Sequence, residues 1–225
     1  MPPAHEAPQL RSPQRPAGPP GAVRPYVAAV HGLLARGHMQ RHLVHFIRAA
    51  GYVDASLYGH LQAAVIADDL QKAAVQGRPV VLVGYSQGGL EAMKVARRLE
   101  RRGVPVALLL LIAARGLGRI FPHRWRADMR HVPPNVALCL NYFAEGDLLG
   151  SDPRPEGNEV VAISSESRVE NIGFSRCENI SHIGISSCYP LVRIPAALKT
   201  RLHDRLLAEL AAITKALRTD PSQAG

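Results

Sequence analysis

The sequence lacks the features that mark exported, disulfide-bonded or membrane-spanning proteins. Only three of its 225 residues are cysteine, and residues 1–24 hold no apolar stretch of the kind found in a secretory signal peptide. An apolar run from Val104 to Ala114 is too short to cross a bilayer and contains Pro105. We therefore expect a cytoplasmic protein with no stable membrane insertion, in which Cys177 and Cys188 are free thiols.

The net charge of the sequence does not by itself identify a class of binding partner. The formal net charge of +9 at pH 7 would suit nucleic acid, a membrane surface or an anionic substrate. However, no nucleic-acid recognition motif accompanies the basic residues, and aromatic residues make up only 5% of the chain. We expect no nucleic-acid partner, and the sequence leaves the oligomeric state open.

Composition divides the chain into one domain and two irregular ends. We expect a disordered, proline-rich leader over residues 1–24, a single domain over residues 25–218 and a disordered tail over residues 219–225. The hydrophobic content of 47% is enough for a sizeable core in a domain of this length.

Within the domain, short apolar runs alternate with segments of helical periodicity. Strands are expected at residues 26–30, 52–58, 79–83, 104–113, 136–143 and 169–174, and helices at about 37–50, 63–74, 90–99 and 202–217. This alternation predicts an α/β fold with a doubly wound, mostly parallel sheet and helices on both faces.

One stretch carries a chemical motif. Residues 84–89 read Gly-Tyr-Ser-Gln-Gly-Gly, directly after a predicted buried strand and directly before a predicted helix. In this context G-x-S-x-G forms a tight turn that exposes the serine hydroxyl, while the glycines let strand and helix approach closely. The pattern predicts that Ser86 is a nucleophile.

With this elbow the sequence resembles the α/β-hydrolase superfamily from about Tyr26 to Leu217, and small bacterial lipases, esterases and thioesterases in particular. The resemblance implies a Ser, Asp/Glu, His triad in that chain order and an oxyanion hole from an upstream loop. It implies neither a metal nor an organic cofactor.

The resemblance also assigns the acid and the base. The acid is expected just past the strand at 136–143, where Asp147 is the leading candidate and Glu145 and Asp152 are competitors. The base is expected in a Ser-His-Ile-Gly segment after the last strand, which makes it His182. By contrast, His203 falls within the terminal helix.

The oxyanion hole is expected from two backbone N–H groups. In relatives with a His-Gly dipeptide after the first strand, the residue after the glycine donates one hydrogen bond, which here is Leu33. The second donor is Gln87, directly after the nucleophile and at the positive end of the next helix.

Two further segments are interpreted less specifically. An irregular stretch at about 115–135 is expected to be a short lid with Phe121 and Trp125 facing the substrate, although a merely structural loop fits equally well. His38, His42 and His45 share one side of a helix and are read as a solvated flank rather than a metal site.

These features predict a serine esterase of the carboxylesterase or lipase kind, which acts on small to medium acyl esters through an acyl-enzyme. A thioesterase for acyl-CoA or an acyl carrier protein is the alternative, because the same catalytic groups cleave both bonds. A binding protein that keeps the fold without turnover is the third possibility.

Overall fold

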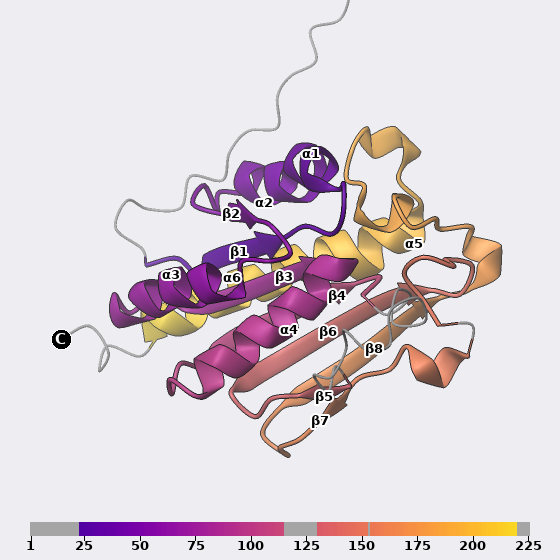
Figure 1. Ribbon diagram of the computed structural model, residues 1–225. Helices are drawn as coiled ribbons and strands as arrows, with labels where there is room; N and C mark the ends of the chain where they lie inside the picture. The colour runs from indigo at the N-terminus through magenta and orange to yellow at the C-terminus, as the bar shows by residue number, and fades with distance from the viewer. Residues whose placement is uncertain (1–22, 115–129, 153, 220–225) are drawn as a thin grey trace, which may run out of the picture.

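Six parallel strands form the centre of the computed structural model, which describes residues 23–114, 130–152 and 154–219 (Figure 1). Across the sheet the order is β2-β1-β3-β4-β6-β8, and every neighbouring pair is parallel. The strands are β1 (Tyr26–Val30), β2 (Ser56–Tyr58), β3 (Val80–Tyr85), β4 (Val106–Ile112), β6 (Val136–Ala144) and β8 (Arg168–Phe174). The predicted α/β class is confirmed.

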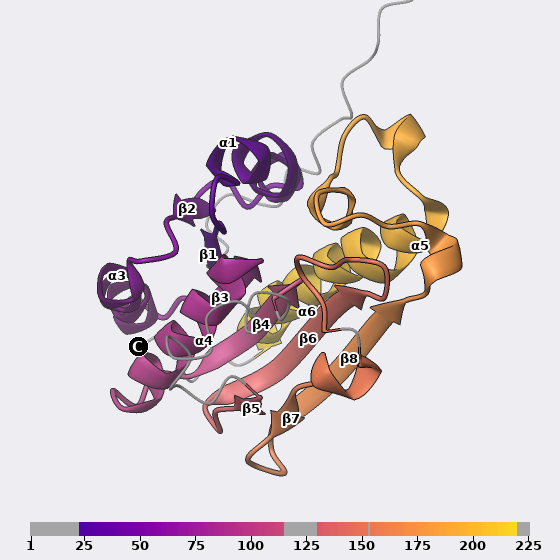
Figure 2. The same cartoon turned by 45° about the vertical axis from the view of Figure 1, so that its right-hand side comes forward.

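Helices cover both faces of this sheet. They are α1 (Arg36–Met39), α2 (His45–Ala49), α3 (Ala63–Val75), α4 (Gln87–Glu100), α5 (Ala196–Leu198) and α6 (Arg205–Thr219). The π-helical turns Gln40–Val44 and Lys199–Asp204 join α1 to α2 and α5 to α6, so residues 36–49 and 196–219 each form one continuous helical segment. These two segments pack on one face, and α3 and α4 pack on the other (Figure 2).

The position of β3 inside the sheet explains why its sequence is apolar throughout. Val81, Val83 and Tyr85 face the core under α1, α2 and α6, whereas Val80 and Leu82 face the core under α3 and α4. Successive side chains of a strand point to opposite faces, so a central parallel strand buries all of them.

Strand order also fixes where a site can form. From β1 the chain moves outward to the edge strand β2, and it then returns to the other side of β1 as β3. In open α/β sheets, ligands bind outside the carboxyl ends of the strands at such a reversal. The loop after β1 and the elbow after β3 both lie at this point.

Two predicted segments differ in detail. The strand expected at 52–58 is shorter, because residues 52–55 form a turn in which the Ala55 N–H donates to the carbonyl of Tyr52 over 3.1 Å. The stretch at 152–167, for which neither a strand nor a helix is expected, contains β7 (Val161–Ala162), which pairs with β5 (His131–Val132). Such two-residue strands are too short to leave a periodic pattern in the sequence.

The expected ends and lid are only partly within the described ranges. Of the lid at 115–135, residues 115–129 lie outside them, and with them Phe121 and Trp125. Nearly all of the expected leader and tail also lies outside. None of the described helices is long and apolar enough to cross a membrane.

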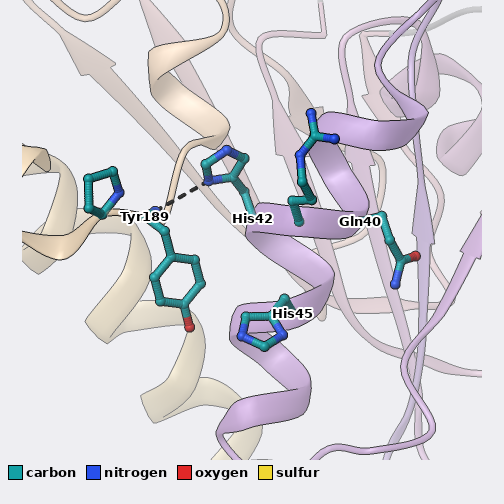
Figure 3. Close-up of a pocket in the computed structure, with 6 residues that line it drawn as sticks. Gln40, His42, His45 and Tyr189 are labelled. Carbon is teal, nitrogen blue, oxygen red and sulfur yellow. Dashed lines mark hydrogen bonds between the residues drawn. The ribbon is translucent and has the colours of Figure 1, made fainter. Parts of the chain in front are cut away.

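The interpretation of the three helix histidines as a solvated flank is wrong for two of them. The His38 Nε2 lies 3.1 Å from the Ser186 Oγ, and the His42 Nδ1 accepts the backbone N–H of Cys188 over 3.2 Å. The same nitrogen of His42 accepts the backbone N–H of Tyr189 over 3.3 Å (Figure 3). Helical periodicity locates the buried stripe of a helix but does not reveal that a distant loop packs along its side. Only His45 is exposed.

The cysteines are free, as expected, with Cys139 and Cys188 buried and Cys177 exposed. Burial raises the pKa of the Cys188 thiol to about 12. Its Sγ lies 3.5 Å from the Nε2 of His203, which is only 1% exposed and whose ring centroid is 5.2 Å from that of Phe46. This pair therefore belongs to the core between the helical segments at 36–49 and 196–219.

The burial of His203 predicts a loss of stability in mild acid. Burial lowers the pKa of His203 from 6.5 to about 4, with Asp204 opposing this shift and Lys199 adding to it. The unfolded chain therefore takes up its proton first as the pH falls, so the free energy of unfolding should decrease between pH 6.5 and about 4. Burial acts on the pKa of His38 in the same direction.

Denaturant titrations across this pH range measure the effect. The variant His203→Gln should show a shallower pH dependence than the unmodified protein, whereas His45→Gln, at an exposed position of α2, should retain the full slope. Equal slopes for all three proteins would contradict the role of His203.

Candidate active site

Ser86 occupies a strained turn between β3 and α4. Its φ of 54° and ψ of −127° are rarely adopted by residues other than glycine, and its N–H donates to the carbonyl of Ile112 over 2.8 Å. A Cβ on Gly88 would overlap the backbone of Val30, so only glycine lets α4 cross β1 this closely. The sequence motif therefore corresponds to an elbow of the expected geometry.

The imidazole of His182 connects Ser86 to Asp147. The His182 Nε2 lies 3.1 Å from the Ser86 Oγ, and the His182 Nδ1 lies 2.7 Å from the Asp147 Oδ2. The three residues follow β3, β6 and β8, which are not all neighbours in the sheet. The structure thus brings together the serine, acid and base that the sequence suggested.

The carboxylate of Asp147 is buried, and both of its oxygens have hydrogen-bond partners. Its side chain is only 1% exposed, and its Oδ1 accepts the backbone N–H groups of Leu149 and Gly150 over 3.0 and 2.9 Å. Because Oδ2 faces the imidazole, both oxygens have partners, as a buried carboxylate requires. The two competing acids lie elsewhere: Glu145 is exposed, and Asp152 accepts the N–H of Arg154 over 2.9 Å.

Gly150 is a site residue that the sequence did not single out. A Cβ on Gly150 would overlap the Asp147 Oδ2 and would stand 2.6 Å from the His182 Nδ1. The hydrogen bond between acid and base therefore requires a residue without a side chain beside it. The only signal was a glycine three positions after the candidate acid.

Gln87 and the loop that holds Leu33, the two expected sources of the oxyanion donors, also lie close to the serine. A Cβ on Gly32 would stand 2.8 Å from the Ser86 Cβ and 3.1 Å from the Gln87 backbone nitrogen. The loop that contains Leu33 therefore lies beside the first turn of α4, whose dipole is positive at this end. Developing negative charge on an oxygen near Ser86 would be stabilised there.

Exposed aliphatic side chains stand next to these groups along the chain. Leu33 is 59% exposed beside Gly32, and Leu148, Leu149 and Ile183 directly follow Asp147 or His182 with more than half of their surface accessible. Exposed leucines are common singly, but here they come from three loops that meet at one hydrogen-bonded cluster. Each of the three loops thus carries an exposed apolar side chain beside a residue of the site.

The site has no feature of a metal centre. Among the residues that the structure describes, no three His, Cys, Asp or Glu side chains are grouped to hold a metal ion. A separate pocket of about 760 Å³ is lined by Gln40, Arg41, His42, His45, Tyr189 and Pro190, and not by the triad (Figure 3). Its walls are the helical segment at 36–49 and the loop that continues from His182.

Comparison with known proteins supports this assignment of the fold. The family model of the thioesterase domain matches residues 36–119, well under half of the chain but including the elbow. No match was found among curated protein sequences.

Two solved structures illustrate the likeness. RedJ, a thioesterase from the prodiginine biosynthetic pathway of Streptomyces coelicolor, is similar with a TM-score of 0.55 and 14% identity over 85% of this chain and 94% of RedJ. An esterase from Pyrobaculum calidifontis is similar with a TM-score of 0.50 and 16% identity over 86% of this chain and 78% of the esterase. With its parallel sheet, its serine elbow and these structural relatives, the chain is an α/β-hydrolase-fold protein.

Proposed function

We propose that this protein is a serine hydrolase that cleaves carboxylic esters through an acyl-enzyme, with Ser86 as nucleophile, His182 as general base and Asp147 as the acid of the triad. The observation that carries the proposal is the hydrogen-bonded chain Asp147–His182–Ser86, with 2.7 and 3.1 Å between the bonded atoms. A strained serine in such a chain has few purposes other than nucleophilic attack.

In the first half of the reaction, the Ser86 Oγ attacks the carbonyl carbon of the substrate while the His182 Nε2 accepts the hydroxyl proton. Asp147 accepts the Nδ1–H, which fixes the imidazole tautomer and stabilises the imidazolium that forms. The N–H groups of Leu33 and Gln87 stabilise the oxyanion. The imidazolium then gives its proton to the leaving group, and the acyl-enzyme remains.

In the second half, a water molecule takes the place of the leaving group. His182 removes a proton from this water as it attacks the acyl carbon, and it returns the proton to Ser86 as the acid product departs. The exposed apolar side chains of Leu33, Leu148, Leu149 and Ile183, on the loops that carry the site, suit an acyl group with a hydrocarbon portion.

The leaving group separates two candidates. Carboxylic esters are the first, supported by the elbow, the His-Gly loop and the Ser-His-Ile-Gly segment. Thioesters are the second, favoured by one specific observation, the match of residues 36–119 to the thioesterase-domain family. The third possibility, a binding protein without turnover, does not explain why a buried acid, an imidazole and a strained serine remain hydrogen-bonded.

Gly150→Ala tests the triad without changing any of its members. The added methyl should displace Asp147 from His182 and lower kcat by about 10²–10⁴-fold, because an unsupported imidazole loses its tautomer and orientation. Steady-state hydrolysis of a p-nitrophenyl ester measures this, with Ser86→Ala as the inactive reference.

Gly146→Ala is the matched control on the other side of Asp147. A Cβ there would meet nothing within 4 Å, so its activity and melting temperature should match those of the unmodified protein. If Gly150→Ala is folded and as active as Gly146→Ala, the acid does not act through this hydrogen bond. If Ser86→Ala retains turnover, the proposed mechanism is wrong.

A parallel assay decides between the leaving groups. Acyl chains of equal length are offered as the p-nitrophenyl ester and as the coenzyme A thioester, and kcat/KM is compared for the two. The ester proposal expects the ester to be the better substrate and its rate to be nearly independent of salt, because a neutral ester is not steered by the net charge of +9. A thioester rate constant well above the ester's would replace the first candidate with the second.

A further inference from the structure

Tyr85 links the nucleophile to the loop that carries the base. It is the last residue of β3 and directly precedes Ser86, and it is only 2% exposed. Its phenol donates a hydrogen bond to the backbone carbonyl of His182 over 2.8 Å. Its ring also packs on the imidazole, with 5.1 Å between ring centroids.

The loop around His182 has little regular structure of its own. Between β8 and α5 it contains only the short 3-10 turns Arg176–Glu178, Gly184–Ser186 and Leu191–Arg193. The position of the imidazole therefore depends on contacts that the loop makes with the rest of the fold. Tyr85 provides one from the sheet, and the bond between His38 and the fully buried Ser186 provides another from the helical segment at 36–49.

The hydrogen bond from Tyr85 is suited to hold the loop of His182 permanently. Burial raises the pKa of the phenol to about 12, so the hydroxyl keeps its proton and remains a donor at neutral pH. Its acceptor belongs to the main chain of His182 rather than to the imidazole, so the bond leaves both ring nitrogens to Asp147 and Ser86.

We propose that Tyr85 is a positioning residue for the general base: its hydroxyl holds the backbone of His182 at the distance from Ser86 that proton transfer requires. This inference rests on the proposed function, in which His182 acts on Ser86. Tyr85 touches neither the substrate carbonyl nor the transferred proton, so its loss should affect the rate of the chemical step and not the binding of substrate.

Tyr142 provides a matched control within the same sheet. It lies on β6, is 1% exposed and donates its phenolic hydrogen to a backbone carbonyl, that of Arg201, over 2.5 Å. Burial raises its pKa to about 12 as well. Arg201 belongs to the helical segment at 196–219, and its side chain pairs with Glu178 over 3.2 Å, so Tyr142→Phe removes a comparable hydrogen bond whose acceptor is not the backbone of His182.

The experiment compares Tyr85→Phe with Tyr142→Phe and with Ser86→Ala. Both phenylalanine variants should fold and should show similar decreases in melting temperature, because each leaves one carbonyl without its donor. Only Tyr85→Phe should lower kcat on a p-nitrophenyl ester, by about tenfold, since a small displacement of a catalytic group is enough to slow the chemical step. Its KM should stay unchanged, and the rate at which a fluorophosphonate modifies Ser86 should fall in proportion to kcat.

Equal kcat values for Tyr85→Phe and Tyr142→Phe would overturn the inference, as would a rise in KM with kcat unchanged. If Ser86→Ala is inactive in that case, the proposed function stands and only the role of Tyr85 is lost. Turnover that survives in Ser86→Ala would overturn the proposed function, because the reaction would then not need Ser86. The role of Tyr85 would fall with it, since that role is to hold His182 at the distance from Ser86 that proton transfer requires.

Discussion

All six strands of the central sheet point the same way, and the candidate site depends on that constraint. Parallel pairing puts every carboxyl end on one edge, so residues far apart in sequence can follow strands and still meet. Ser86, Asp147 and His182 follow β3, β6 and β8 in this way. The strained backbone of Ser86 is held by the same packing, because Gly88 allows α4 to lie directly against β1.

A set of contacts around the site holds the turn of Asp147 and the loop of His182 in place. Asp147 is fixed by the N–H groups of its own turn, and Gly150 leaves room for the imidazole beside it. The loop of His182 is held from the sheet by Tyr85 and from the helical segment at 36–49 by His38 and His42. The imidazole can thus be rigid although no long helix or strand carries it.

Local patterns predicted the fold and pointed to the three polar residues that the structure brings together. A strand, a G-x-S-x-G turn and a helix follow one another along the chain, so Ser86 could be recognised from residues 79–99 alone. The acid and the base could be placed because each follows a strand in the order that the resemblance implies. The competition among Glu145, Asp147 and Asp152 could not be decided by sequence, because it depends on which carboxylate reaches His182 across the sheet edge.

The remaining features depend on contacts between distant segments. Ser186 meets His38 across 148 positions, and neither residue lies in a motif. The interpretation of the helix histidines as a solvated flank fails for His38 and His42 because the sequence shows their spacing but not the loop that packs against them. The sequence shows Gly150 only as a glycine after Asp147, whereas the fold shows that a Cβ there would overlap the Asp147 Oδ2 and crowd the His182 Nδ1. The roles of Phe121 and Trp125 stay predictions, because both lie outside the described residues.

Peptide mapping after reaction with a fluorophosphonate tests the central claim most directly. Ser86 is only 7% exposed, whereas Ser165 and Ser181 lie on the surface, so accessibility alone would favour the other serines. If His182 activates Ser86 as the geometry suggests, the probe will modify Ser86 alone. Modification of Ser165 or Ser181 with Ser86 left intact would contradict the account.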